Sequence, residues 1–353
     1  MKKSLMIVTA FICCMFALGC GSAPVSDADA QAAEEEMDYI VVGFSQLGAE
    51  SDWRTANTES MRSILSEENG FELIFDDAQQ KQENQITAIR NFIQQEVDYI
   101  VLAPVTETGW DTVLQEAKDA GIPVILVDRM VDVEDDSLYT AWVGSNFALE
   151  GAKASEWINQ FLQAKGIEHA NIVNIQGTIG SSAQIGRTES LRQACRANSN
   201  MTLLDEEPGE FTQAKGQEVM ESFLKQYEDI DIVYCENDNE AFGAIDAIEA
   251  AGKKVGSDIA HGEIMVLSFD AARSGVEDVL KGKITLAAEC NPLHGPRIQG
   301  IIKTLERGGT PDKVAYADEG LYAHDATVKT VTVEDKTYEV TVVTEEVLAG
   351  RAY

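Results

Sequence analysis

Residues 122–129 read IPVILVDR, and this stretch decides the fold class. Four apolar residues follow a proline, as in a strand buried on both faces, and Asp128 and Arg129 come directly after them. Segments with helical spacing, such as ENQITAIRNFIQQ and GWDTVLQEAKDAG, lie between this run and others like it, so a parallel sheet is predicted. The other runs are YIVVGFS, FELIF, YIVLAPV and AWVG, which begin at Tyr39, Phe71, Tyr99 and Ala141.

A second series of the same kind follows a long helical segment that begins after Asn146. Its strands are predicted at NIVNIQG, MTLLDEE, IDIVYCEN, EIMVLSFD and ITLAAEC, and helical stretches follow most of them. We therefore predict an α/β protein with two doubly wound parallel-sheet lobes. Near the end of the sequence, TVKTVTVEDKTYEVTVV alternates in polarity, which indicates an antiparallel strand or a hairpin.

Polar side chains follow the predicted strands of both lobes. In an open parallel sheet, ligands bind outside the carboxyl ends of the strands, where the chain is held rigidly and is still open to solvent. A cleft between the two lobes is therefore predicted to hold the ligand. The strand-end residues are Ser45 and Gln46, Asp128 and Arg129, Ser145 and Asn146, Gln176, Asn237 and Asp238, Asp270, and Glu289.

These residue types suit a carbohydrate. A guanidinium or a carboxylate can span two adjacent hydroxyls of a sugar. Trp53, just after the first strand, and Phe211, in the second lobe, offer apolar faces for the C–H groups of a sugar ring. Two other interpretations stay open here: Asp128 and Arg129 as a structural ion pair, and Trp53 as packing between helix and sheet.

The first residues indicate export. Lys2 and Lys3 precede an apolar run from Leu5 to Leu18 that is too short to span a bilayer, so residues 1–19 are predicted to be a signal peptide. Small residues before Cys20 match a lipoprotein cleavage site, and residues 20–37 would form an acidic, lipid-anchored linker. The expected location is extracytoplasmic, on the cell surface or in the periplasm. Ordinary secretion with an incidental Cys20 is the alternative.

The composition excludes several classes of protein. A formal charge of -33 repels phosphate backbones and anionic headgroups, so no nucleic acid partner is expected, and membrane contact is expected only through the anchor. After export and lipidation, Cys195, Cys235 and Cys290 would remain, in no spacing that indicates a disulfide framework or a metal site. The sequence also lacks a nucleophile elbow, a P-loop or a dinucleotide fingerprint after any strand, so we expect no enzymatic activity and no cofactor.

Seven motifs together resemble one family, the sugar-binding proteins of bacterial ABC importers of the ribose/galactose type. They are VVGFSQLGAESDWR, DAQQKQENQITAIRNFI, APVTETGW, IPVILVDR, IQGTIGSSAQIGR, FTQAKGQEVMESF and VYCENDNEAFGAI. The stretches FSQLGAESDWR and QQKQENQ are most similar to its galactofuranose-binding branch. The likeness runs from about Tyr39 to Tyr322, whereas the sequence beyond Tyr322 is less matched.

The resemblance implies the type 1 periplasmic-binding-protein fold, a two-lobed clamp with a hinge of three crossing segments. The first lobe would comprise residues 38–145 and 291–322, and the second residues 146–290 and 323–353. Trp53 and Arg54 would cap the sugar, Asp128 and Arg129 would grip vicinal hydroxyls, and Glu289 would reach the ligand from a crossing segment. The whole predicted ligand-binding set is Ser45, Gln46, Glu50, Trp53, Arg54, Asp128, Arg129, Asn146, Arg187, Phe211, Asn237, Asp270 and Glu289.

The function implied is delivery of a monosaccharide, galactofuranose or a related sugar, to a membrane permease by a monomeric binding protein. One alternative is a sensory protein that presents its bound sugar to a chemoreceptor or a histidine kinase. A gene regulator would need a basic helix-turn-helix before the first strand, where this sequence has a signal and an acidic tether. A carbohydrate-processing enzyme would turn its sugar over instead of only binding it.

Overall fold

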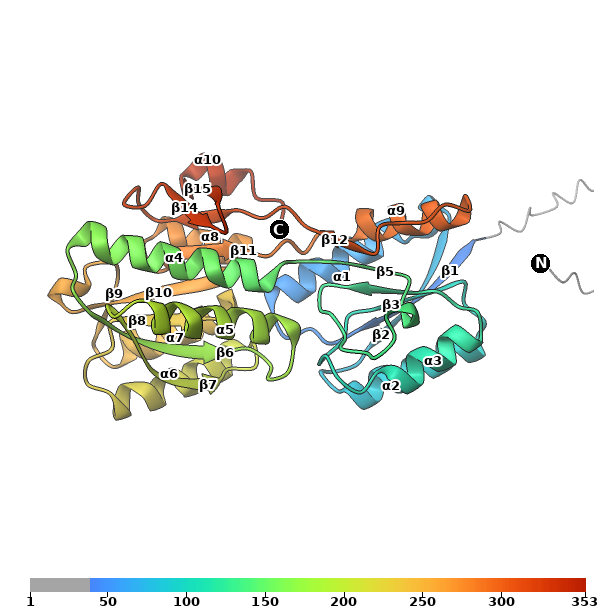
Figure 1. Cartoon of the computed structure of the whole chain (residues 1–353), viewed down its shortest axis with the longest axis horizontal. Coiled ribbons are helices and arrows are strands. Elements are labelled where there is room, and N and C mark those ends of the chain that lie inside the picture. The colour runs from blue at the N-terminus through green and yellow to red at the C-terminus, as the bar shows by residue number, and fades with distance from the viewer. Residues whose placement is uncertain (1–38) are drawn as a thin grey trace, which may run out of the picture. The chain divides into compact units, whose positions relative to one another are not determined.

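The computed structural model describes residues 39–353, which form one sheet of six strands and one of nine (Figure 1). The predicted signal peptide, linker and Cys20 lie outside the described residues. Within the described part of the chain, no helix has the length and apolar character needed to cross a bilayer.

The first lobe is built on the six-stranded sheet, whose strands are all parallel and follow the order β12-β5-β4-β3-β1-β2. Val124 and Leu126 of β4 pack against one layer of helices, while Ile125 and Val127 pack against the other, so the whole strand is buried. Its strands are β1 (Ile40–Gln46), β2 (Phe71–Asp77), β3 (Tyr99–Leu102), β4 (Val124–Val127), β5 (Ala141–Gly144) and β12 (Val314–Tyr316), and its helices are α1 (Asp52–Ile64), α2 (Gln82–Gln94), α3 (Asp111–Asp119) and α9 (Gly295–Glu306).

The second lobe is built on the nine-stranded sheet, in the order β14-β15-β13-β11-β10-β8-β6-β7, with β9 beside β10. Its strands are β6 (Ala170–Gln176), β7 (Met201–Pro208), β8 (Ile232–Cys235), β9 (Lys254–Val255), β10 (Glu263–Asp270), β11 (Leu286–Glu289), β13 (Leu321–Ala323), β14 (Thr330–Val333) and β15 (Lys336–Val342). Its helices are α4 (Phe147–Lys165), α5 (Ser182–Ala197), α6 (Gln213–Gln226), α7 (Asp238–Ala250), α8 (Arg273–Leu280) and α10 (Glu345–Ala349).

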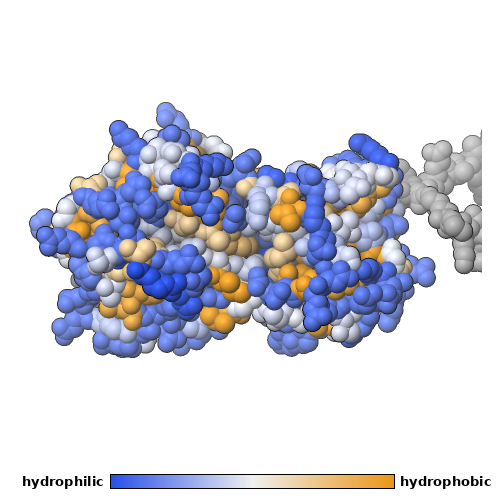
Figure 2. Space-filling model, in the orientation of Figure 1, coloured by the Kyte–Doolittle hydropathy of each residue, from blue (hydrophilic) through white to orange (hydrophobic). Residues whose placement is uncertain are grey.

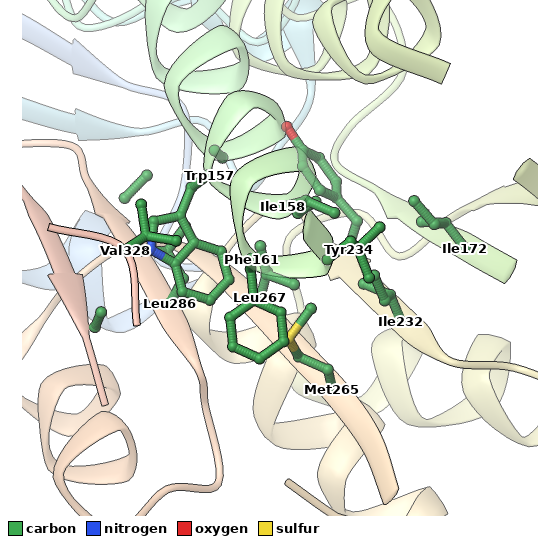
Figure 3. Packing of buried hydrophobic residues seen from close by; sticks show 14 of the residues in the cluster. Trp157, Ile158, Phe161, Ile172, Ile232, Tyr234, Met265, Leu267, Leu286 and Val328 are labelled. Carbon is green, nitrogen blue, oxygen red and sulfur yellow. The ribbon is translucent and has the colours of Figure 1, made fainter. Parts of the chain in front are cut away.

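A large apolar core lies between α4 and the central strands of the second sheet (Figure 3). Trp157 and Phe161 of α4 stack with ring centroids 5.0 Å apart and pack against Leu267 of β10 and Leu286 of β11. A second cluster fills the opposite face of this sheet, beneath α6, α7 and α8. Both faces of each sheet are therefore covered, which holds the strand ends in fixed positions.

The predicted antiparallel hairpin is present as β14 and β15. Glu334 and Asp335 form its turn with φ angles of 50° and 63°, as a tight two-residue hairpin turn requires. The hairpin joins the second sheet through β15, which runs parallel to β13.

The described chain passes between the lobes at residues 145–146, 290–294 and 317–320. The third lies slightly earlier than expected, because Leu321 and Tyr322 pair with Ala288 and Ala287 of β11 and so belong to the second lobe. Leu321 is also buried in the core of that lobe.

The visible surface is mostly polar. The face seen in Figure 2 is largely hydrophilic, with small separate apolar patches. The large hydrophobic residues found exposed among the described residues are Ile179, Ile185, Val314 and Tyr316.

Candidate functional site

The carboxyl ends of the strands in both sheets border one small cavity between the lobes. Nine of the residues predicted from the sequence line it: Glu50, Trp53, Arg54, Asp128, Arg129, Arg187, Phe211, Asn237 and Asp270.

The N-terminus of α1 forms much of the first-lobe wall. Ser51 caps this helix by accepting a hydrogen bond from Arg54 N at 3.1 Å, which fixes the first turn that carries Trp53 and Arg54. The Arg54 guanidinium donates to Asp128 Oδ2 at 2.7 Å and to Glu50 Oε1 at 3.1 Å. Burial lowers the pKa of Arg54, but attraction to Asp128 and Glu50 outweighs burial and raises that pKa above its usual range.

The end of β4 explains why two opposite charges follow a buried strand. Asp128 has a φ of 65°, a left-handed conformation held by hydrogen bonds from Asp128 N to Val143 O and from Trp142 Nε1 to Asp128 O. Its ion-pair partner within residues 39–353 is Arg54, not Arg129. The two adjacent charges are therefore separate components of the cavity wall.

Arg129 is buried with few partners in the protein. Among the described residues, its guanidinium donates one hydrogen bond, to Val105 O at 2.8 Å, and its Cζ atom lies 5.1 Å from the centre of the Phe211 ring. Burial and the nearby Arg54 lower the pKa of Arg129 to about 10, so the group stays charged at neutral pH. A ligand with hydroxyl acceptors would give this buried charge the partners it lacks.

Arg187 of α5 is the central cation of the second-lobe wall. It contacts Glu150 Oε2 at 2.8 Å and Asp270 Oδ1 at 3.7 Å, and it donates to the carbonyl of Glu236. Burial lowers the pKa of Arg187, but the neighbouring acidic groups, Glu150 foremost, raise it well above the ordinary value. Burial raises the pKa of Asp270, and Arg187 opposes that effect.

Phe211 is held over the cavity by its backbone. Phe211 N donates to Glu240 Oε1 at 2.7 Å, and Asn237 Nδ2 donates to Phe211 O at 3.1 Å. The residue has a φ of 61°, and a Cβ atom on Gly177 would lie 1.9 Å from its ring. Glycine at position 177 is therefore required for Phe211 to take this position.

Contacts across the mouth of the cavity show that the lobes are closed on one another. Trp53 Nε1 donates to Cys290 O at 2.6 Å, and Trp53 packs with Phe147 and Phe211 of the second lobe. Further hydrogen bonds between the lobes join Glu107 N to Gly180 O at 2.9 Å, Met130 N to Ser182 Oγ at 3.0 Å and Asp52 N to Asn239 Oδ1 at 3.1 Å.

Comparison with known proteins identifies the fold. The sequence profile of the periplasmic binding protein domain matches residues 42–292. The chain belongs to this family. The predicted fold class is confirmed, and so is the prediction that the chain is a binding protein and not an enzyme. Family membership also places the protein outside the cytoplasm.

Several relatives are named for furanose sugars. The galactofuranose-binding protein YtfQ of Escherichia coli K12 is 41% identical over 81% of this chain and 88% of its own length. A Mycobacterium smegmatis protein solved with β-D-fucofuranose is 42% identical, with a TM-score of 0.77 over 82% of this chain and 92% of that chain. The binding protein of an arabinose ABC transporter from Shewanella sp. ANA-3, bound to L-arabinofuranose, is 38% identical, with a TM-score of 0.75 over 81% and 93% of the two chains.

Four predicted residues of this periplasmic binding protein do not line the cavity. Ser45 lies at the buried end of β1, and Gln46 accepts from Arg54 behind the first-lobe wall. Asn146 caps α4 by accepting from Leu149 N. The carboxylate of Glu289 points away from the cavity and accepts hydrogen bonds from Arg351, Tyr353 and Gly320.

Four lining residues were outside the predicted set: Ser51, Phe147, Ala183 and Cys290. Phe147 and Cys290 each follow a predicted strand-end residue directly, so extending each polar strand end by one residue would have found both. Ala183 lies four residues before Arg187, one helical turn away on the same face of α5. Ser51 precedes the predicted Trp53 and Arg54, and its signal is the N-cap pattern of α1.

One group of side chains in this periplasmic binding protein has the composition of a metal site. Possible ligand atoms of Glu150, Cys290 and Glu319 lie within 4.8 Å of one another. Each group already has a partner: Glu150 pairs with Arg187, Cys290 Sγ is 3.2 Å from Ser145 Oγ, and Glu319 accepts from Asn291 N at 2.9 Å. Burial and Glu150 raise the pKa of Glu319, whereas hydrogen bonds from Ser145 and Asn291 oppose that effect.

Proposed function

We propose that this protein is the extracytoplasmic substrate-binding component of an ABC sugar importer and that its ligand is a furanose monosaccharide, galactofuranose or a related sugar. The observation that carries the proposal is the convergence of Asp128 and Arg129 from one lobe and Arg187 and Asp270 from the other on a single small cavity. The furanose ring form is supported by the names of the relatives described above.

The cavity chemistry supports a sugar in particular. Arg129 and Arg187 offer planar donors that can bridge adjacent hydroxyls, and Asp128 and Asp270 offer acceptors. Trp53 and Phe211 supply apolar ring faces, one from each lobe. Glu50 adds a buried carboxylate oxygen, Oε2, that has no hydrogen-bond partner among the described residues.

The protein would act by closing its two lobes around the bound sugar. Because the lining residues come from both lobes, a sugar makes its full set of contacts only when the lobes are closed, and it stabilises that state by its differential affinity. A membrane permease would then recognise the closed form. The arabinofuranose-bound relative is named as a component of an ABC transporter, which favours delivery to a permease over delivery to a sensory receptor.

We further propose that the protein is a monomer held at the membrane by lipid on Cys20, with residues 20–37 as a tether. One lipid-modified cysteine would keep the lobes near their permease without a spanning helix. Replacing Cys20 by Ser is expected to move the protein from the membrane fraction to the soluble extracytoplasmic fraction. Unchanged membrane association would contradict the anchor.

The sugar assignment is tested by isothermal titration calorimetry. L-Arabinose and D-galactose form furanose rings in solution and are expected to bind, whereas methyl α-D-galactopyranoside, which is locked as a pyranose, is expected not to bind. Trp53→Ala is expected to abolish the signal. Arg90→Ala, which removes an exposed ion pair with Glu116, is the matched control. Binding of the locked pyranoside would contradict the furanose assignment.

A further inference from the structure

The closing segment, residues 345–353, lies behind the second-lobe wall of the cavity. It begins with α10, which packs against α8, and Arg273 Nη1 of α8 donates to Leu348 O at 3.2 Å. The chain then brings the side chain of Arg351 to the ends of β10 and β11. This segment does not line the cavity, so any effect on a ligand must act through the residues that it holds.

The Arg351 guanidinium joins three parts of the second lobe. It donates from Nη1 to Glu289 Oε1 at 2.7 Å and to the Tyr322 hydroxyl at 2.9 Å, and from Nη2 to Ala271 O at 2.5 Å. The rings of Tyr322 and Tyr353 lie 4.8 Å and 4.4 Å from its Cζ atom, and the Tyr353 hydroxyl donates to the same Glu289 oxygen at 2.6 Å. The planar fork of Arg351 is thus fixed in one orientation.

The turn that Arg351 contacts is the one that places Asp270 in the cavity. Asp270 and Ala271 have φ angles of 91° and 51°, so two successive residues with a Cβ atom adopt a conformation that favours glycine. Asp238 holds one side of this turn by accepting from Ala272 N at 2.8 Å and from Ser268 Oγ at 2.6 Å. Arg351 holds the other side through the carbonyl of Ala271.

We infer that Arg351 is a positioning residue for ligand binding, which keeps the Asp270–Ala271 turn in the conformation that directs Asp270 toward the ligand and Arg187. Its charge also balances Glu289, which would otherwise be a buried carboxylate without a cation. The inference rests on the proposed function, because it takes a sugar in this cavity as the ligand. It assigns the closing segment a part in affinity although that segment is outside the cavity.

The test compares affinities for L-arabinose by calorimetry and melting temperatures without ligand. Arg351→Ala is expected to weaken binding about tenfold, the effect of one lost charge-assisted hydrogen bond. In an Ala271→Gly background the same substitution is expected to cost clearly less affinity, because glycine adopts the turn conformation unaided. Arg351→Lys is expected to restore part of the loss. Arg273→Ala, which loses a contact to the closing segment but none to the turn, is the control and is expected to stay within about twofold.

Two results would overturn the inference: an unchanged affinity in Arg351→Ala with a lowered melting temperature, or the same loss of affinity with and without Ala271→Gly. If Arg351→Ala does not fold, Arg351→Gln, which keeps the aliphatic stem between the tyrosines, takes its place in the comparison. Failure of the wild-type protein to bind L-arabinose, D-galactose or any other furanose-forming sugar would instead refute the proposed function, and this inference with it.

Discussion

Two arginines that line the cavity differ in how many ion pairs and hydrogen bonds they form with the protein itself. Arg187 pairs with Glu150 and Asp270, whereas the guanidinium of Arg129 has one hydrogen bond, to Val105 O, among the described residues. Removing one partner of a buried ion pair leaves an uncompensated charge, but removing an unpaired buried charge does not. The two residues should therefore separate ligand binding from stability.

Arg129→Met is expected to weaken sugar binding about 10–150-fold, since hydrogen bonds to charged groups contribute about 1.5–3 kcal/mol. The free energy of unfolding without ligand should change by less than about 1 kcal/mol. Arg187→Met should lower both affinity and stability, the latter by about 3–5 kcal/mol, because Glu150 loses its partner. Calorimetry and urea denaturation measure the two quantities. A stability loss in Arg129→Met as large as in Arg187→Met would contradict this reading of the cavity.

Glu236 predicts how stability depends on pH. This carboxylate is buried beneath Arg187 and accepts from Gly177 N at 2.9 Å. Burial raises the pKa of Glu236 from 4.5 to about 7 despite its hydrogen bonds. Between those two pH values the folded protein binds more protons than the unfolded chain, so the contribution of Glu236 to stability is full below about pH 4.5 and is lost as the pH rises through about 7.

Urea denaturation across this pH range tests the expectation. The unfolding free energy of the ligand-free protein should fall as the pH rises, and Glu236→Gln should reduce the slope. Burial also raises the pKa values of Glu240 and Asp270, so part of the slope should remain in the variant. A stability that rises with pH through this interval would contradict the burial of these carboxyl groups.

At the scale of elements, the sequence predicts the buried central strands and the β14–β15 hairpin, but not the short strands β9, β12 and β13. Strands such as β4 are continuous apolar runs because helices cover both faces of the sheet. The short β13 carries a much weaker signal; the resemblance implies a third crossing after Tyr322, whereas in the structure the crossing precedes Leu321. Where an element ends is set partly by its pairing partner, which a single sequence does not reveal.

The candidate site, too, could be located from the sequence only in part. Asp128, Arg129, Asn237 and Asp270 line the cavity, because a polar residue after a buried parallel strand has few other places to lie. Glu289 follows the same pattern but points to Arg351, which is 62 positions further along the chain. Long-range pairing of this kind leaves no local signal, so the direction of Glu289 required the structure.

The close contact between Phe211 and Gly177, the residue that follows β6, leads to a prediction. Gly177→Ala should weaken sugar binding, because the new methyl group would displace the Phe211 ring that covers the cavity. Gly300→Ala is the matched control: position 300 lies inside α9 with open space around it, and the change should stabilise the protein by about 0.5–1 kcal/mol without affecting affinity. Calorimetry and thermal melting of both variants provide the comparison. Equal affinities would show that Phe211 is not needed for binding.

At the scale of the whole molecule, two lobes with separate apolar cores are joined by three short crossings, and the residues that line the cavity are divided between them. This division makes affinity depend on closure, since neither lobe alone supplies both aromatic faces and both arginines. The net charge of -33 disfavours electrostatic contact of the lobes with anionic lipids, so recognition of the closed lobes would depend on a specific partner.

The most direct test of this account is the crystal structure of the protein grown with D-galactose. We expect one furanose ring in the cavity, in contact with Trp53 and Phe211 and with its hydroxyls within hydrogen-bonding distance of Arg129 and Arg187. A sugar held by one lobe alone, or bound anywhere outside the cavity between the lobes, would contradict it.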